Sequence, residues 1–326
     1  MNNSLKSLSN LTPGTVIHGK WHRNQYTIIK ELGNGANGVV YLVRDSGRQV
    51  ALKISDNPSS IISEVNVLKS FTKVQGSALG PSLFDVDDWE TRSNQFSFYV
   101  MEFIKGPDLL TFIQQKGPEW LGVLLLQLLA DLDVLHEKGW VFGDLKPENL
   151  LVNGPPVRVR CIDVGGTTMK GRAIKEFTEF YDRGYWGLGS RKADERYDLF
   201  AVAMVIINTA YPRRFNKTTG GISQLMEMVK QKPELKLYES MIKNALSGNY
   251  QTAGEMRSDV LSALQPPKQK GDAGSQVKSR SQLHRTRAQR NVTKKATKKK
   301  GGLFETTLII LTLSVLYFFY IYVQIL

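Results

Sequence analysis

Cysteine is nearly absent from this chain of 326 residues, and the chain does not open on an apolar run. The single cysteine, Cys161, excludes an intramolecular disulfide and fits a reducing, cytosolic setting. The opening residues, MNNSLKSLSN, lack the apolar core that a secretory signal peptide needs. Together these two absences indicate a folded part that stays in the cytoplasm.

Acidic residues are scarce in one segment, and that segment accounts for most of the formal net charge of +13. Residues 265–302 hold twelve lysines and arginines against the single acid Asp272, whereas residues 1–264 hold 31 basic and 28 acidic residues. Residues 265–302 also contain few apolar side chains, so they cannot bury a core. We expect them to form a disordered basic linker.

A glycine-rich turn follows the first predicted strand of the chain, residues 26–32. Gly33, Gly35 and Gly38 have the spacing GxGxxG, which lets a backbone approach phosphate groups because no Cβ intervenes. The β-branched residues that follow, 39–43, disfavour the helix that a dinucleotide-binding fold would place there. We therefore expect a β-hairpin that covers a nucleotide.

Two charged residues lie on the next predicted elements. Lys53 ends a predicted strand, residues 50–54, and Glu64 lies on a predicted helix, residues 59–71. Alone, such a lysine is more often a solvated edge residue, and such a glutamate is more often exposed. The upstream glycine turn instead favours a lysine that faces phosphates and a glutamate that pairs with it.

Three polar residues in the stretch 140–149 suit phosphoryl transfer. Asp144 can orient a hydroxyl and take its proton, Lys146 can neutralise phosphate charge, and the amide oxygen of Asn149 can hold Mg²⁺. Ordinary turns also gather these residue types. Asp163 follows a predicted buried strand, where an unpaired carboxylate would be costly unless a cation such as a metal ion met it.

In this order, the motifs resemble those of protein kinases of the Hanks type, over about residues 12–264. They are Gly33-x-Gly35-x-x-Gly38-x-Val40, Lys53, Glu64, Asp144-x-Lys146-x-x-Asn149 and Asp163-Val164-Gly165. Four stretches, 142–147, 162–168, 179–186 and 301–308, are similar to the YabT-type kinases of spore-forming bacilli.

The resemblance implies an α+β, two-lobed kinase fold. A small antiparallel β lobe with one helix would occupy about residues 12–104, after a tail of residues 1–11, and a larger, mainly helical lobe would occupy about residues 105–264. Asp144 would be the catalytic base, Lys146 would contact the γ-phosphate, and Asn149 and Asp163 would hold Mg²⁺, with Mn²⁺ as an alternative. A lysine two residues after the base is the Ser/Thr-directed pattern. The implied ATP-binding residues are Gly33, Gly35, Gly38, Val40, Ala51, Lys53, Glu64, Met101, Glu102 and Phe103.

One departure from the family pattern concerns regulation. Phe142 and Gly143 replace the usual His-Arg before the base, and glycine offers no charge to a phosphorylated activation loop. We predict that activity does not depend on that switch. Loss of activity on joint replacement of Thr167, Thr168 and Thr178, with the fold intact, would contradict this prediction.

A second departure concerns the end of the activation loop. The usual Ala-Pro-Glu is missing, and Gly187-Leu188-Gly189 stands nearby, so the sequence does not predict the ion pair that usually anchors the loop in the family. Asp198 matches the buried aspartate that fixes the catalytic-loop backbone in the family.

The end of the chain lacks charge. Residues 306–326 contain no charged side chain, and a helix of twenty residues spans about 30 Å, the thickness of a bilayer core. We expect residues 303–326 to be a C-terminal transmembrane anchor in the cell membrane; a buried terminal helix is the alternative. The lysines before it place the kinase domain in the cytoplasm, and we expect no extracellular sensor.

The basic linker, residues 265–302, is expected to meet anionic partners, although a solvated spacer is the alternative. Residues beside the anchor would meet anionic lipid headgroups, and residues farther away than the roughly 8 Å screening length would hold a polyanion such as DNA, without sequence preference. Polyanions or homodimer formation through the linker would then modulate activity. The first group is Lys294, Lys295, Lys298, Lys299 and Lys300, and the second is Lys278, Arg280, Arg285, Arg287 and Arg290.

The predicted function is transfer of the ATP γ-phosphate to serine and threonine hydroxyls of proteins, including the chain itself, by a membrane-anchored kinase. One alternative is a small-molecule phosphotransferase, because Gly143-Asp144 also resembles aminoglycoside and choline kinases, although Lys146-Pro147 speaks against it. The other is a non-catalytic scaffold, against which the intact set of site residues argues.

Overall fold

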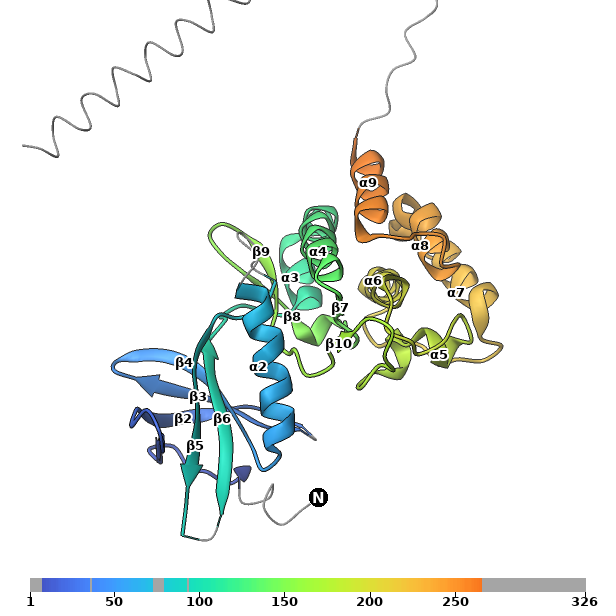
Figure 1. The fold of residues 1–326 in the computed structure, drawn as a ribbon. Coiled ribbons are helices and arrows are strands. Elements are labelled where there is room, and N and C mark those ends of the chain that lie inside the picture. The colour runs from blue at the N-terminus through green and yellow to red at the C-terminus, as the bar shows by residue number, and fades with distance from the viewer. Residues whose placement is uncertain (1–7, 36, 73–78, 93, 266–326) are drawn as a thin grey trace, which may run out of the picture. The chain divides into compact units, whose positions relative to one another are not determined.

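An antiparallel sheet of six strands forms most of the N-terminal lobe in the computed structural model, which describes residues 8–265 except residues 36, 73–78 and 93 (Figure 1). The strand order is β1-β2-β3-β4-β6-β5, and all neighbours are antiparallel. The strands are β1 (Val16–His18), β2 (Gln25–Gly35), β3 (Gly38–Asp45), β4 (Arg48–Ser55), β5 (Leu83–Glu90) and β6 (Gln95–Glu102).

Both faces of this sheet are covered. Because side chains alternate along a strand, Ala51 of β4 lies in the core that contains Val65 and Leu68 of helix α2 (Pro58–Thr72), whereas Leu52 belongs to a separate core on the opposite face. Leu8, in the predicted N-terminal tail, is buried in that second core. The start of the described chain therefore packs on the lobe.

The C-terminal lobe is mainly helical (Figure 1). Its centre is α6, in which residues 197–208 are all buried, with the apolar α4 beside the same core. The helices are α3 (Leu109–Lys116), α4 (Trp120–Glu137), α5 (Arg183–Trp186), α6 (Glu195–Ala210), α7 (Gly221–Lys230), α8 (Glu239–Leu246) and α9 (Ala253–Leu264), with 3₁₀ turns at Pro147–Asn149, Glu179–Tyr181 and Pro233–Tyr238. The predicted β-rich and helical lobes are thus confirmed.

Two short strand pairs carry the loops that face the N-terminal lobe. β8 (Leu150–Asn153) pairs with β9 (Arg158–Cys161), and β7 (Trp140–Val141) pairs with β10 (Thr168–Met169). The chain between β7 and β8 is the predicted catalytic loop, and the chain between β9 and β10 contains Asp163. Pairing of these strands brings the two segments together.

The predicted linker after its first residue, Gln265, and the predicted anchor lie outside the described residues. Within residues 8–265, apart from the gaps given above, no helix combines the length and the apolar character needed to cross a bilayer.

Candidate active site

A cavity of about 630 Å³ lies between the two lobes, within the size range of small-molecule sites. Every predicted ATP-binding residue except Glu64 lines it, as do both predicted metal-binding residues, Asn149 and Asp163. The end of β6 and the chain after it, residues 101–104, lie on one side of the cavity, and the glycine-rich turn between β2 and β3 lies on another. The cavity therefore gathers residues that stand far apart in the sequence.

The three glycines of the turn differ in how much space surrounds them. At Gly38 (φ +135°) a Cβ would lie 2.5 Å from the carbonyl oxygen of Ile54, so the neighbouring strand leaves no room for a side chain. A Cβ at Gly33 or Gly35 would meet nothing within 4 Å. These two positions leave open space on the cavity side, as close approach of phosphates to the backbone requires.

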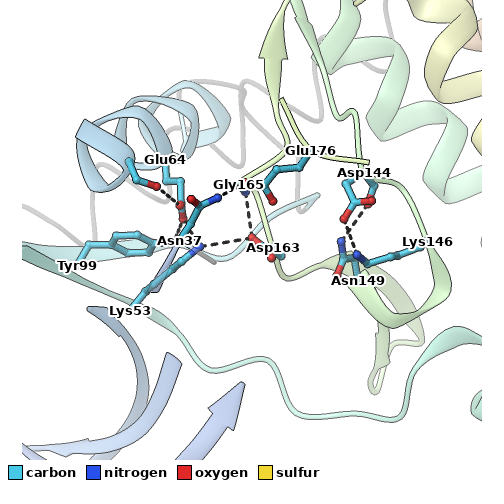
Figure 2. A network of polar contacts seen from close by, with 11 residues as sticks. Asn37, Lys53, Glu64, Tyr99, Asp144, Lys146, Asn149, Asp163, Gly165 and Glu176 are labelled. Carbon is cyan, nitrogen blue, oxygen red and sulfur yellow. Dashed lines mark hydrogen bonds and ion pairs between the residues drawn. The ribbon is translucent and has the colours of Figure 1, made fainter. Parts of the chain in front are cut away.

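Lys53 is fixed by a buried carboxylate. Its Nζ donates to Glu64 Oε2 over 2.7 Å, and Glu64 also accepts from the Tyr99 hydroxyl (2.7 Å) and the Ser60 hydroxyl (3.2 Å) (Figure 2). Burial alone would lower the pKa of the Lys53 ammonium, but Asp163 and Glu64 raise it above its ordinary value. Lys53 thus stays charged, and its predicted pairing with Glu64 is confirmed.

Asp163 faces the cavity rather than the protein interior. Its carboxylate Oδ1 lies 3.7 Å from Lys53 Nζ and accepts from the Gly165 amide over 3.0 Å, and 48% of the side chain is exposed. The strand before it, β9, is largely buried, and the cation expected beside the carboxylate is supplied here by Lys53. Asp163 and Asn149 still present oxygen ligands to one cavity, and such a set fits Mg²⁺.

The catalytic-loop backbone is held by Asp198, as predicted. Asp198 is fully buried, and it accepts from the amides of Phe142 (2.7 Å) and Gly143 (2.9 Å), while His136 Nε2 lies 2.8 Å from the same carboxylate. Gly143 has φ +86°, and a Cβ there would lie 2.5 Å from the carbonyl oxygen of Gly166. The glycine that replaces the family's arginine is thus required by the backbone itself.

Asp144, on the same loop, lies in a cluster of polar side chains. Its carboxylate accepts from Lys146 Nζ (2.5 Å) and from the Thr178 hydroxyl (3.0 Å), and Lys146 Nζ also donates to Thr178 over 3.1 Å. The Asn149 amide nitrogen donates to the Asp144 carbonyl over 2.9 Å, which leaves the amide oxygen for a metal ion. The arrangement holds a carboxylate beside an ammonium group, on a loop whose Asn149 lines the cavity.

The protein kinase domain family matches residues 26–265 of this chain. The chain belongs to the protein kinase family. It is 52% identical to the serine/threonine-protein kinase YabT of Bacillus subtilis (strain 168), over 98% of both chains. Catalytic subunit 3 of cAMP-dependent protein kinase from Drosophila melanogaster is 28% identical over 41% of this chain. The probable serine/threonine-protein kinase PknB of Lactococcus lactis is 31% identical over 45% of this chain. These two matches span 24% of each relative.

The chain is therefore an ATP-dependent serine/threonine kinase, similar to YabT over nearly its whole length. Protein kinases use ATP with a divalent metal ion, and the phosphate-accessible glycines and oxygen ligands described above suit both. The comparisons do not favour a small-molecule phosphotransferase or a non-catalytic scaffold.

The activation segment is the chain from Asp163 to about Gly189. The kinase anchors it without the family's usual ion pair. Arg183, at the start of α5, donates two hydrogen bonds to the Asp194 carboxylate over 2.9 and 2.8 Å, and its guanidinium is buried. Asp182 caps the same helix and accepts from Arg191 over 2.7 Å and from the Tyr197 hydroxyl over 2.9 Å. These contacts tie the end of the segment to the start of α6, a role that the sequence pattern did not assign.

The threonines considered as regulatory sites occupy different environments. Thr167 and Thr168 are fully buried, whereas Thr178 bonds to both Asp144 and Lys146. Replacing all three together would therefore also remove the Thr178 hydrogen bonds to Asp144 and Lys146. The joint replacement cannot test a phosphorylation switch alone.

Sequence reasoning missed Glu176 of the activation segment and Asn37 of the glycine-rich turn. The Asn37 amide donates to Glu176, whose carboxylate is half-buried beside Asp163 (Figure 2). Burial and the nearby Asp163 charge raise the pKa of the Glu176 carboxyl, although Lys53 opposes them. The two residues are separated by 139 positions; Asn37 occupies a variable position of the glycine motif, and Glu176 belongs to no motif described above.

The ten predicted polyanion-binding and lipid-binding residues, from Lys278 to Lys300, all lie outside the described residues. Their roles remain predictions from the sequence.

Proposed function

We propose that this serine/threonine kinase transfers phosphate to protein hydroxyls by using Asp144 as the general base. The supporting observation is the Asp144–Lys146–Thr178 cluster, which lies beside the cleft that contains Lys53 and Asp163. Lys53, held by Glu64, would position the α- and β-phosphates of ATP, and Lys146 would steady the γ-phosphate.

In the proposed step, Asp144 takes the proton of the acceptor hydroxyl as that oxygen bonds to the γ-phosphorus. The bond from the γ-phosphorus to the β,γ-bridging oxygen breaks, and ADP leaves. Asn149 and Asp163 would hold Mg²⁺ or Mn²⁺, which when bound neutralises phosphate charge. The hydrogen bonds of Asp198 to the amides of residues 142 and 143 keep the base in place.

The test is transfer of labelled γ-phosphate from ATP to protein, including the kinase itself, by wild type and by Asp144→Asn. The carboxamide preserves shape but cannot take the proton, so we expect the rate to fall roughly 100- to 10,000-fold. Binding of Mg·ADP should stay within about twofold, the margin of an intact site. Full activity of the variant would exclude Asp144 as the base.

We propose further that activity does not require phosphorylation of the activation segment. Support comes from the backbone of Gly143, which leaves no room for a phosphate-reading arginine, and from the Arg183–Asp194 pair, which anchors the segment without modification. Purified kinase treated with a Ser/Thr phosphatase, and freed of it, should keep its initial rate. A lag that ends with autophosphorylation would contradict the proposal.

The cellular setting that we propose is the membrane, with residues 303–326 as a C-terminal anchor and residues 1–302 in the cytoplasm. The support is the uncharged stretch 306–326, directly after a cluster of lysines. Alkaline extraction of cell membranes should leave the full chain in the pellet, whereas a peripheral protein would be released.

For the basic linker, residues 265–302, we propose binding to DNA or anionic lipid, with an effect on activity and on homodimer formation. Two full-chain variants separate the partners: glutamine at Lys278, Arg280, Arg285, Arg287 and Arg290, and glutamine at Lys294, Lys295, Lys298, Lys299 and Lys300. The first should lose DNA affinity, with the salt slope reduced by roughly one per lost phosphate contact, and the second should lose binding to anionic vesicles. Wild-type DNA retention in both variants would exclude a DNA role.

A further inference from the structure

Two cavities meet at a single pair of side chains. The nucleotide cavity of about 630 Å³ holds Lys53 and Asp163, and a second cavity of about 820 Å³ is lined by Asp144, among other residues. Of the described residues, Asn37 and Glu176 line both cavities. Because the Asn37 amide donates to Glu176, this bonded pair lies where the two cavities adjoin.

Two contacts hold the chain at Glu176, one made by Glu176 itself and one by its neighbour Lys175. Lys175 donates to the Ser63 hydroxyl of α2 over 2.8 Å, so the activation segment is fastened to the N-terminal lobe at two adjacent residues. Figure 2 shows the Glu176 carboxylate beside Asp163 and Gly165, on the side of the cleft that leads to Asp144. None of the ion pairs among the described residues includes Glu176, so Asn37 is the partner that keeps this carboxylate in the cleft.

This placement conflicts with phosphoryl transfer. The acceptor oxygen must come within about 3–3.5 Å of the phosphorus in line with the leaving group, so the space between the two cavities must be open. A carboxylate in that space also repels the negative charge of the γ-phosphate. Glu176 therefore has to leave before the acceptor held near Asp144 can meet the phosphate.

We propose that the Asn37–Glu176 hydrogen bond is a gate between the nucleotide site and the acceptor site, and that it must open for each transfer. This inference rests on the proposed roles of Asp144 and Asp163. While the bond is closed, the γ-phosphate is screened from protein hydroxyls and from water on the acceptor side. The gate would restrain basal activity without any phosphorylated residue.

Asn37→Ala tests the gate in the full chain, because it removes the donor and leaves the glutamate charge. We expect the kcat of autophosphorylation and the rate of ATP hydrolysis without a protein acceptor to rise roughly three- to tenfold, the equilibrium shift expected from loss of one part-exposed hydrogen bond. In the hydrolysis, water takes the acceptor's place: its oxygen bonds to the γ-phosphorus, its proton goes to Asp144, and ADP leaves.

A reversed pair provides the rescue. Asn37→Asp alone places two carboxylates together and should also raise both rates. Asn37→Asp with Glu176→Gln restores one hydrogen bond with donor and acceptor exchanged and with the original net charge, so the rates should return to within about twofold of wild type. Glu179→Ala, at an exposed carboxylate of the same segment that lines neither cavity, is the matched control and should change nothing.

Mg·ADP affinity, measured by calorimetry, and the KM for ATP separate a gate from a structural contact. A gate predicts that Asn37→Ala raises kcat with little change in either value. A fall in kcat or a rise in KM for ATP would mean that the bond positions the glycine-rich turn productively, and unchanged rates would mean that it does nothing; both overturn the proposal. If Asp144→Asn kept activity, the base assignment would fail, yet the response of ATP hydrolysis to Asn37→Ala would still decide the gate.

Discussion

Substitution of Gly143 provides the most direct test of how the catalytic loop is built. Gly143→Ala adds one methyl group at φ +86°, 2.5 Å from the carbonyl oxygen of Gly166. The left-handed backbone costs about 1–2 kcal/mol for a residue with a side chain. Forcing the methyl group into a filled space adds about 1–3 kcal/mol. The expected loss of unfolding free energy is therefore about 2–5 kcal/mol, from these two contributions.

Gly139 provides the matched control for this prediction. It lies in the turn before β7 with φ +82°, and a Cβ there would meet nothing within 4 Å. Gly139→Ala should therefore show the backbone contribution alone, about 1–2 kcal/mol. Urea unfolding of both variants, followed by fluorescence, gives the two free energies. Equal losses would refute the argument that close approach to Gly166 excludes a side chain at Gly143. Gly143→Arg should then destabilise the kinase at least as much as Gly143→Ala, without creating a phosphate-dependent switch.

Three further predictions concern single contacts. Thr178→Val should lower kcat roughly tenfold, because it removes hydrogen bonds to Asp144 and Lys146. Thr178→Ser should keep most of the wild-type kcat, as measured by initial rates of phosphate transfer. An unchanged kcat in Thr178→Val would contradict this prediction. Burial raises the pKa of Glu102, but hydrogen bonds, first of all from Arg160, bring this pKa below its ordinary value. The ionised Glu102 therefore stabilises the fold at pH values above its ordinary pKa, and this stabilisation is lost as the pH falls below that value. Arg160→Gln should therefore weaken the fall in urea stability between about pH 6 and pH 3, and an identical fall in both proteins would refute the link. Burial also raises the pKa of the Cys161 thiol, so iodoacetamide should label it only in urea, and rapid labelling of the native kinase would contradict its burial.

Contacts between residues that are close in the sequence were predicted, whereas a contact between residues that are far apart in the sequence was not. Lys53 and Glu64 stand eleven positions apart on adjoining elements, and their pairing was predicted from the strand and the helix that carry them. The cation beside Asp163 was expected from the buried strand that precedes this carboxylate, but that local pattern does not show that 48% of the side chain faces the cavity. The Asn37–Glu176 bond escaped prediction altogether, since 139 positions separate the partners and no periodicity relates them.

The sequence by itself determined the chemistry of this kinase. The identity and spacing of the glycines, the lysine, the carboxylates and the amide specify phosphoryl transfer, because each step needs a particular functional group. Only the tertiary structure decided how these groups are held and separated. Arg183 and Asp194 anchor the activation segment, a neighbouring carbonyl leaves no room for a side chain at Gly143, and Glu176 lines both cavities. These features depend on contacts between loops that are far apart in the sequence, and local residue patterns do not predict such contacts.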